Sequence, residues 1–571
     1  MSAKRFKVFA VATLLGAGAL AQAEETNQPA WMQPDPAAVK KWQDLRFGMF
    51  IHWGPVSLTG HEIGWSRGKQ TPIEKYDSLY KEFNPEKFNA AEWVGIAKAA
   101  GMKYIVLTTK HHDGFCLWDT KLTDYNIMHS PFKRDVVKEL AEACKQQGIA
   151  FGAYYSVTDW YNPDWPVGSP AGKVPHAQPN LDAYEKYLQG QITELIKNYG
   201  PLITIWNDVP RGFQGRGLHT IKMVRELQPD ITINNRTGDG GDYDTPEQRV
   251  GGFNLERPWE SCMTVSAHNH WAWGGQDDGV KPLAACLLML IRGAGGDGNV
   301  LLNVGPRPDG LIDPAQAARL KDIGDWLAKY GESIYATHGG PYKPTKTAVS
   351  TRKGNTIYIH ITAWPEETLK LPPLPAKIVK SSVLTGGVAT VQQTEAGVEI
   401  SVPAANRQEI DTIVALELDQ PAIAIAPISV GGESLTTRKR AKASNVCQNN
   451  RHYSAAQAVD GEDGTRWATE ATTKQCWLEV DLGKEETFDR AIIQECVQFG
   501  VRVKSFELQT KDGKDWKTFF KGGPIGKKLE LKFAPITARI VRLNLDGEKG
   551  PTISEFQLFA PQGILSLRTK P

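Results

Sequence analysis

Residues 103–115, KYIVLTTKHHDGF, place a continuous apolar run directly before a group of polar side chains. Such a run of Tyr, Ile, Val and Leu is typical of a strand in a parallel sheet that is covered on both faces. Lys-His-His-Asp follow at the carboxyl end of this expected strand, which is where barrels of alternating strands and helices hold their active sites. The stretch therefore predicts a parallel α/β fold with its chemistry near His111 and His112.

The region from about residue 47 to residue 307 alternates short apolar runs with helix-periodic segments. This alternation is typical of a parallel sheet with crossover helices. Strand after strand ends in His, Asp, Asn or Arg, which favours a (β/α)8-like barrel over an open doubly wound sheet. No GxGxxG or GxxxxGK[ST] motif follows an expected strand, so a nucleotide-binding fold lacks its main support. Six runs are expected as strands: FGMFIHWG, KYIVLTTKHHDG, IAFGAYYS, PLITIWND, ITINNR and NVLLNVGP.

Two all-β regions are expected after the barrel. From about residue 343, short β-branched runs are separated by Gly, Pro and Asn turns, which predicts a small antiparallel sandwich. The PAIAIAP stretch at 421–427 is typical of a stiff linker, and a second all-β unit follows it. The predicted fold class is multidomain, a (β/α)8-like (TIM) barrel followed by two all-β sandwich domains. The expected bounds are 24–340 for the barrel, 341–425 for the first sandwich and 433–571 for the second.

The first 23 residues have the pattern of a secretory signal peptide. Lys4, Arg5 and Lys7 precede an apolar run, and Ala21-Gln-Ala23 supplies the small residues of a cleavage site. No cysteine follows the run, and no later apolar stretch of about 20 residues could span a bilayer. We therefore expect an exported protein, periplasmic or extracellular, rather than one held by an uncleaved anchor helix.

Composition narrows the possible partners and cofactors. The net charge of +2 over 571 residues, with scattered charges, argues against a nucleic-acid binder. Seven cysteines are sparse and odd in number, so disulfides are not the main stabilising links, although Cys447 and Cys476 could pair. The sequence has no CxxC or HExxH motif, so a zinc or redox role has little support.

Polar and aromatic residues end the expected strands, and a barrel would bring these ends round one mouth. A mixture of imidazoles, indoles, phenols and carboxylates suits a sugar, whose hydroxyls need donors and acceptors and whose ring can lie on Trp. Taken singly, each residue could instead be structural. The residues expected near this mouth are His52, Trp53, Glu62, Trp65, His111, His112, Tyr154, Tyr155, Trp206, Asn207 and Asp208.

Hydrolysis of a glycoside requires two carboxyl groups, about 5 to 5.5 Å apart in a retaining enzyme. Asp208 is the natural nucleophile because it ends an apolar strand, and a helix N-cap is its alternative role. Glu247, Glu256 and Glu260 are the candidates for the acid/base. Glu260 is the first choice, since apolar neighbours would raise its pKa, and Glu247 is the second, since its loop could swing into the site.

Seven stretches resemble the α-L-fucosidases of glycoside hydrolase family 29: FGMFIHWG, YIVLTTKHHDGFCLWDT, GAYYSVTDWY, ITIWND, RPWESCMT, HWAWGG and GNVLLNVGPRPDG. The resemblance implies a retaining exo-hydrolase that removes terminal α-L-fucose from oligosaccharides or glycoconjugates through a fucosyl-enzyme on Asp208. It favours Glu260 as acid/base, although some members use carboxylates matching Glu247 or Glu62. Val209 and Pro210 follow the nucleophile where Gly is more usual. The implied substrate-binding residues are His52, Trp53, Glu62, Trp65, His111, His112, Tyr155, Trp206 and Trp271.

The last region resembles discoidin-type (coagulation factor 5/8 C) domains and family 32 carbohydrate-binding modules. The stretches that carry this resemblance are AAQAVDGEDGTRWAT, CWLEVDLG, ARIVRLNL and TISEFQLF. It implies a possible structural Ca2+ held by Asp460, Asp463 and Glu555, whose hard oxygen ligands suit that ion, although Asp-Gly turns also occur without one. No cofactor is expected for catalysis.

Three alternatives remain open at this point. The pocket could serve a related sugar, as in an α-L-galactosidase, or the chain could be a fucose-binding protein without activity. A metal-dependent hydrolase using His111, His112 and Asp113 is the third. Beside Asp208, we expect the two histidines to hold sugar hydroxyls and Asp113 to brace a loop.

Overall fold

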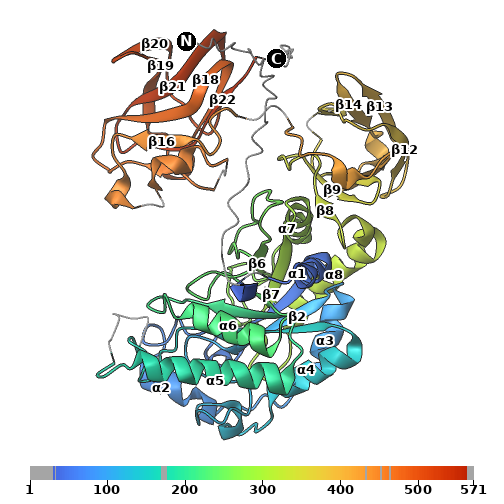
Figure 1. Cartoon of the computed structure of the whole chain (residues 1–571), viewed down its shortest axis with the longest axis vertical. Helices are drawn as coiled ribbons and strands as arrows, with labels where there is room; N and C mark the ends of the chain where they lie inside the picture. Colours follow the sequence, from blue (N-terminus) through green and yellow to red (C-terminus); the bar gives the residue numbers. More distant parts are fainter. Residues whose placement is uncertain are drawn as a thin grey trace, which may run out of the picture. The chain divides into compact units, whose positions relative to one another are not determined.

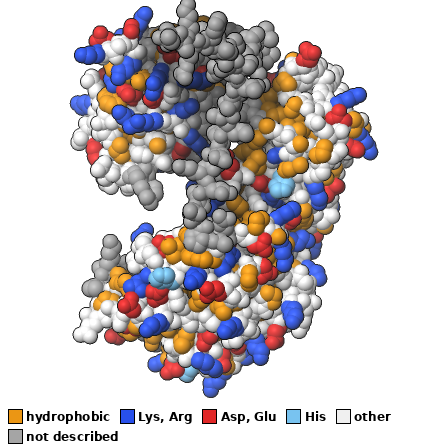
Figure 2. Space-filling view, in the orientation of Figure 1, with side chains coloured by type: hydrophobic (Ala, Val, Ile, Leu, Met, Phe, Trp, Pro, Cys, Tyr) orange, Lys and Arg blue, Asp and Glu red, His pale blue; other side chains and the backbone are white. Residues whose placement is uncertain are grey.

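The computed structural model describes residues 30–32, 34–168, 176–364, 366–430, 434–450, 453–461 and 464–561. The predicted signal peptide, 1–23, and Asp463 lie outside the described residues. The chain forms two compact units, Met1–Gly339 with Thr351–Lys353 and Gly340–Ser350 with Gly354–Pro571. On the face in Figure 2, basic and acidic side chains are intermingled, as expected from the near-neutral net charge.

A parallel seven-stranded sheet forms the core of the first unit, in the order β5-β4-β3-β2-β1-β7-β6. Figure 1 labels β2, β6 and β7 of this sheet together with the helices of the first unit. Every residue of β2 is buried, as the apolar run at 104–110 predicts. The register places Asp208 beside Ser156 and Asn303 beside Phe50, so the polar strand ends lie at one edge. The strands are β1 (Phe47–Ile51), β2 (Tyr104–Lys110), β3 (Ala150–Ser156), β4 (Thr204–Asp208), β5 (Thr232–Ile233), β6 (Glu260–Thr264) and β7 (Asn299–Val304).

An irregular segment connects the two edge strands of this sheet. Isolated parallel bridges join Asn234 to Tyr243, Asp244 to Trp259 and Glu247 to Cys262. Residues 243–247 thus take the place of an eighth strand in the predicted barrel. The surrounding sequence is rich in Gly, Asp and Pro, which are depleted in strands, so a regular strand does not form here. The sheet is TIM-like, with seven regular strands in place of eight.

Eight helices accompany the sheet along the described part of the first unit. The helix-periodic segments form helices with buried apolar residues, for example Val137, Leu140 and Cys144 on α4. Asp135 caps the start of α4 by accepting from the Lys138 amide, and Gly148 ends it in the left-handed conformation with φ 73°. The helices are α1 (Pro36–Leu45), α2 (Ile73–Ser78), α3 (Ala90–Ala99), α4 (Val136–Gln147), α5 (Leu181–Tyr199), α6 (Gly217–Leu227), α7 (Leu283–Gly295) and α8 (Pro314–Tyr330).

An antiparallel all-β region follows, as predicted. Its two sheets have the orders β12-β15-β10-β9-β8 and β11-β14-β13. Ile359 and Val414 of the first sheet and Val398 and Ile400 of the second belong to one hydrophobic core, so the sheets pack as a sandwich. The strands are β8 (His338–Gly339), β9 (Ala348–Lys353), β10 (Thr356–Ile361), β11 (Thr368–Leu371), β12 (Ile378–Val383), β13 (Thr390–Thr394), β14 (Gly397–Ser401) and β15 (Thr412–Leu418).

The last region is also antiparallel and has a separate hydrophobic core, which includes Trp467, Leu478, Val541 and Phe556. Its strands follow the order β17-β22-β18-β21-β19-β20, and β16 pairs with β18. They are β16 (Arg440–Ala443), β17 (Trp467–Ala468), β18 (Gln475–Glu495), β19 (Val503–Asp512), β20 (Asp515–Gly522), β21 (Leu529–Gly547) and β22 (Thr552–Phe559).

Two predictions about the whole chain can be compared with this fold. All seven cysteines are free thiols, so the suggested pairing of Cys447 with Cys476 is wrong for this structure. Among the residues that the structure describes, no helix combines the length and the apolar character needed to cross a membrane.

Candidate active site

A pocket lies at the carboxyl ends of the parallel strands, and most of the predicted site residues line it. Its walls come from β1, β3, β4 and β6, from the segments that follow β1, β2, β5 and β6, and from segment 243–247. The lining residues are Phe50, His52, Trp65, His111, His112, Tyr154, Trp206, Asp208, Arg236, Glu247, Cys262 and Trp271.

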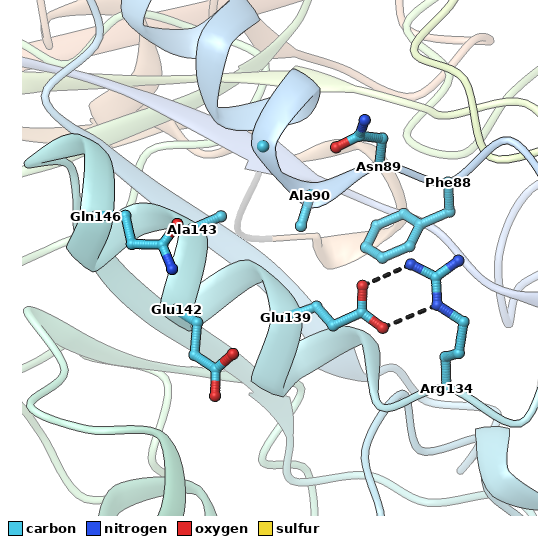
Figure 3. Close-up of a pocket in the computed structure, with 9 residues that line it drawn as sticks. Phe88, Asn89, Ala90, Arg134, Glu139, Glu142, Ala143 and Gln146 are labelled. Carbon is cyan, nitrogen blue, oxygen red and sulfur yellow. Dashed lines mark hydrogen bonds and ion pairs between the residues drawn. The ribbon is translucent and has the colours of Figure 1, made fainter.

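A larger surface cavity, about 410 Å³, lies between α3 and α4 (Figure 3). None of the predicted site residues lines it. Its most prominent polar groups bind each other, since the Arg134 guanidinium donates to both carboxylate oxygens of Glu139 at 2.9 and 2.6 Å. The chemistry therefore belongs to the smaller pocket at the strand ends.

Asp208 is held as a carboxylate at the bottom of this pocket. The Tyr154 hydroxyl donates to its Oδ2 at 2.8 Å, and Arg236 donates to its Oδ1 at 2.9 Å. Burial alone would raise the pKa of Asp208, but the charge and hydrogen bond of Arg236, with His112 and Tyr154, hold it below its ordinary value. Asp208 does not cap a helix, because Arg216 occupies the N-cap of the following helix, α6. The residue is thus an ionised carboxylate whose two oxygens are each held by a donor.

Arg236 is a site residue that the sequence reasoning missed. It follows the short strand β5 and uses its planar fork to reach two carboxylates, Asp208 at 2.9 Å and Glu247 Oε2 at 2.9 Å. Its guanidinium also lies over the Trp206 ring, 4.8 Å from the centroid. The run ITINNR could have indicated Arg236, because this expected strand ends in a polar residue, as the other expected strands do.

The two acid/base candidates lie at different depths. Glu247 lines the pocket and its side chain is 43% exposed. Glu260 is completely buried as the first residue of β6, far from the carboxyl end of that strand, and does not line the pocket. Burial raises the pKa of Glu260 to about 7, as predicted, and its carboxylate accepts hydrogen bonds from Trp206 and Tyr104. Glu256 is exposed and outside the pocket. Of the three candidates, Glu247 is the one that lines the pocket.

Hydrogen bonds determine which ring nitrogen of His52 carries the proton. The Asn303 side-chain amide donates to the Trp271 carbonyl at 2.7 Å, so its Oδ1 accepts from His52 Nδ1 at 2.6 Å. Burial lowers the pKa of His52 to about 3, so its ring is neutral. His52 Nε2 then carries a lone pair that can accept a hydrogen bond from a sugar hydroxyl.

His112 is arranged in the same way. The Ser156 hydroxyl donates to the Thr158 carbonyl at 2.5 Å and accepts from His112 Nδ1 at 2.6 Å. Burial lowers the pKa of His112 to about 4, and its Nε2 lies 3.7 Å from Asp208 Oδ2. Burial also lowers the pKa of His111, with further contributions from His112 and His52. These histidines are therefore neutral hydrogen-bonding groups.

Aromatic rings supply the apolar walls. Trp65 is 38% exposed and meets His112 edge-on, with ring centroids 5.4 Å apart. Trp206 stacks on Tyr154 at 5.5 Å and 20°. Trp271 lies 4.8 Å from the His52 ring. The pocket thus offers both polar groups and apolar ring faces.

Three predicted substrate-binding residues lie outside the pocket. Trp53 is part of the core, where its indole donates to the Arg307 carbonyl at 3.0 Å. Tyr155 points to the other face of β3 and donates to Gln191 at 2.8 Å, because side chains alternate along a strand; Tyr154 takes the predicted place. Glu62 accepts from the Trp271 and Ala272 amides at 2.9 Å each, and it does not line the pocket.

Asp113 has the bracing position expected for it. The Tyr76 hydroxyl donates to its Oδ2 at 2.6 Å, and its Oδ1 accepts from the Phe115 amide. Asp113 does not line the pocket. A metal-dependent hydrolase built on His111, His112 and Asp113 therefore has no support from this geometry.

Residues 14–332 match the family model described as Alpha-L-fucosidase. The chain belongs to the α-L-fucosidase family. Residues 440–556 match the F5/8 type C domain. The two matches confirm both resemblances. The chain is therefore an enzyme, a glycoside hydrolase of family 29.

Proteins that are similar to this chain are named α-L-fucosidases. Human plasma α-L-fucosidase is 30% identical over 377 residues, which cover 59% of this chain and 79% of the relative. The structure of α-L-fucosidase isoenzyme 1 from Paenibacillus thiaminolyticus is 31% identical, with a TM-score of 0.62, and covers 67% of this chain and 99% of that one. A Bacteroides thetaiotaomicron α-L-fucosidase, described as a trapped covalent intermediate with 2-fluoro-fucosyl fluoride, is 28% identical, with a TM-score of 0.60, and covers 68% of this chain and 97% of that one. These relatives do not favour the galactosidase or the inactive binding protein.

In the F5/8 type C region, two of the three predicted calcium ligands are described. Asp460 accepts from the Thr465 hydroxyl at 2.8 and 2.9 Å, and Glu555 accepts from the Gly461 amide at 2.9 Å. Both carboxylates thus accept hydrogen bonds from protein groups, the Thr465 hydroxyl and the Gly461 amide. Over the described positions, His, Cys, Asp and Glu do not assemble three potential metal ligands. Asp463 lies outside the described residues, so the predicted Ca2+ stays a prediction.

Proposed function

We propose that the chain is an exported retaining exo-α-L-fucosidase that removes terminal α-L-fucose through a covalent fucosyl-enzyme on Asp208. One observation carries this proposal. A single guanidinium, that of Arg236, contacts both Asp208 and Glu247 at the bottom of a pocket of neutral histidines and tryptophans. Two carboxylates on one guanidinium are compatible with the separation of about 5 to 5.5 Å that retention requires.

In the first step, an Asp208 oxygen attacks the anomeric carbon while Glu247 donates a proton to the departing glycosidic oxygen. The bond from the anomeric carbon to that oxygen breaks, and an ester of fucose with Asp208 forms. In the second step, Glu247 accepts a proton from water, the water oxygen attacks the anomeric carbon, and Asp208 leaves as a carboxylate. A covalent intermediate is described for the Bacteroides relative, which supports this sequence of steps.

The surrounding residues have separate tasks. Arg236 and Tyr154 orient the Asp208 carboxylate, each by donating to one of its two oxygens. The Nε2 atoms of His52 and His112 accept hydrogen bonds from fucose hydroxyls. The rings of Trp65, Trp206 and Trp271 contact the apolar faces of the sugar, including its methyl group.

The proposal extends to the rest of the chain. The pattern at residues 1–23 supports export, and the division at 24–340, 341–425 and 433–571 supports a catalytic domain with two accessory β domains. We assign fucosylated oligosaccharides or glycoconjugates as substrates. Catalysis needs no cofactor, so activity should persist in chelator, and a Ca2+ dependence of melting would support the predicted ion.

Nucleophile substitution tests the mechanism. Asp208→Ala or Asp208→Gly should abolish release of 4-nitrophenol from its α-L-fucoside, and azide should restore it with the inverted fucosyl azide as product. Asp325→Ala, on an exposed carboxylate of α8, is the matched control and should behave as wild type. Full activity in the Asp208 variants would refute the assignment. The paired α-L-galactoside tests the choice of sugar.

Acid/base substitution tests Glu247 against Glu260. Glu247→Ala should lose little activity on the 4-nitrophenyl substrate and much more on a fucosylated oligosaccharide, because only the poorer leaving group needs a proton. Azide should accelerate this variant. The same pattern in Glu260→Ala, and its absence in Glu247→Ala, would reverse the two assignments.

A further inference from the structure

Glu260 has no role in the proposed mechanism, although it lies inside the barrel directly behind the pocket. It is the first residue of β6 and is fully buried. It belongs to the Trp-Glu-Ser-Cys stretch at 259–262 that the sequence analysis singled out. A carboxyl group in this position needs hydrogen-bond partners to compensate for its burial.

Each carboxylate oxygen of Glu260 has one donor. The Trp206 indole Nε1 donates to Oε1 at 3.0 Å, and the Tyr104 hydroxyl donates to Oε2. An indole N–H can only donate, whereas a hydroxyl can also accept. Trp206 therefore depends on an acceptor at this position, and Tyr104 does not.

Trp206 in turn contacts both residues that orient the nucleophile. Its ring stacks on Tyr154, with centroids 5.5 Å apart, and the Arg236 guanidinium lies 4.8 Å from its centroid. Tyr154 and Arg236 each donate a hydrogen bond to Asp208. A shift of the indole would move the donors of both Asp208 oxygens.

We propose that Glu260 is a positioning residue, which fixes the Trp206 indole and through it the Tyr154 and Arg236 donors on Asp208. This inference rests on the proposed function, because it assumes that Asp208 is the nucleophile. Glu260 transfers no proton to or from the substrate. Its chemical requirement is an acceptor for the indole N–H, and a negative charge is not needed.

Substitution by glutamine and by leucine separates these requirements. Glu260→Gln can place its carbonyl oxygen on Trp206 and its amide on the Tyr104 oxygen, so kcat/KM should stay within about tenfold of wild type. Glu260→Leu removes the acceptor and should lower kcat/KM by about tenfold to a hundredfold, the effect of losing a buried hydrogen bond with the donors that depend on it. Melting temperatures show whether each variant is folded.

Leaving-group dependence distinguishes positioning from proton transfer. Glu260→Leu should lose the same factor on 4-nitrophenyl α-L-fucoside and on a fucosylated oligosaccharide, since a misplaced nucleophile slows both. Trp206→Phe, which removes the N–H, should show a similar loss, and the double variant should be little worse than either single variant.

Several results would overturn the inference. Glu260→Leu with wild-type activity, or a folded Glu260→Gln as poor as Glu260→Leu, would show that the acceptor is not what matters. A larger loss on the oligosaccharide, with rescue by azide, would make Glu260 the acid/base. Failure of the proposed function is recognised separately, as an inactive wild type or an active Asp208→Ala.

Discussion

Removal of Arg236 should change the pH at which the enzyme works. Arg236 donates to Asp208 Oδ1 at 2.9 Å, and the two side chains are only 21% and 13% exposed, so solvent screens this pair weakly. Burial, the largest influence on Asp208, acts to raise its pKa, and Arg236 opposes burial by its charge and by its hydrogen bond. In Arg236→Ala the effect of burial prevails, and the carboxyl group holds its proton to higher pH.

The size of the effect follows from the contact that is lost. A hydrogen bond to a charged group contributes about 1.5 to 3 kcal/mol, and one pKa unit corresponds to about 1.4 kcal/mol. Loss of this contact should therefore raise the pKa of Asp208. Because only the ionised carboxylate attacks, the acid limb of kcat/KM moves to higher pH, and kcat/KM on that limb falls by about tenfold to a hundredfold. The variant then loses more activity at pH 5 than at pH 8.

The assay is the pH profile of kcat/KM with 4-nitrophenyl α-L-fucoside. Arg236→Lys is the second variant, because lysine keeps the charge but cannot bridge two carboxylates with a planar fork. Its acid limb should lie between those of Arg236→Ala and wild type. Arg249→Ala, at an exposed arginine nearby in sequence, is the control and should keep the wild-type profile. An acid limb that stays in place in Arg236→Ala would refute the role given to Arg236.

Three further outcomes are expected. Tyr154→Phe removes one donor from Asp208 and should lower kcat/KM by about tenfold or more, whereas Tyr155→Phe, on the other face of β3, should leave it near wild type; equal losses would contradict the assignment of Tyr154 to the pocket. Burial raises the folded-state pKa of Glu260 to about 7, so the folded chain binds this proton more tightly than the unfolded chain does. The stability that the bound proton contributes is therefore lost as the pH rises from about 4.5 to about 7. The free energy of unfolding of Glu260→Gln should lack this loss, so it should increase relative to that of wild type by up to about 3 kcal/mol between pH 4 and pH 8. A difference that does not depend on pH would contradict this prediction. Glu62→Ala leaves two loop amides without their acceptor and should raise KM and lower the melting temperature; an unchanged KM would show that the loop does not need it.

The general plan of the catalytic region can be predicted from local patterns. A strand buried on both faces requires a continuous apolar run, so the run at 104–110 identifies β2 without reference to the rest of the chain. Periodic apolar positions identify the buried face of α4 in the same way. Asp208 could also be found, because a carboxylate that ends an apolar strand lies at the end where such folds gather their polar groups.

Which neighbouring residue faces the pocket, and at what depth, was decided by tertiary structure. Tyr154 and Tyr155 are alike in sequence, but the pairing of β3 with β4 turns only Tyr154 toward Asp208. Glu260 has an apolar setting that raises its pKa, yet it begins β6 and therefore lies below the mouth.

Glu247 and Arg236 show the same limit of the sequence. Segment 243–247 has no strand pattern, and only its bridges to β5 and β6 carry Glu247 to the pocket. Arg236 lies next to Glu247 in the pocket because its guanidinium compensates the charges of two carboxylates, Asp208 and Glu247. These lie 28 and 11 positions away from it in the chain. Residue type and local pattern determine which strands form and which end carries the chemistry. The register of the strands and the path of an irregular segment determine which carboxylates meet, because these depend on packing between distant parts of the chain.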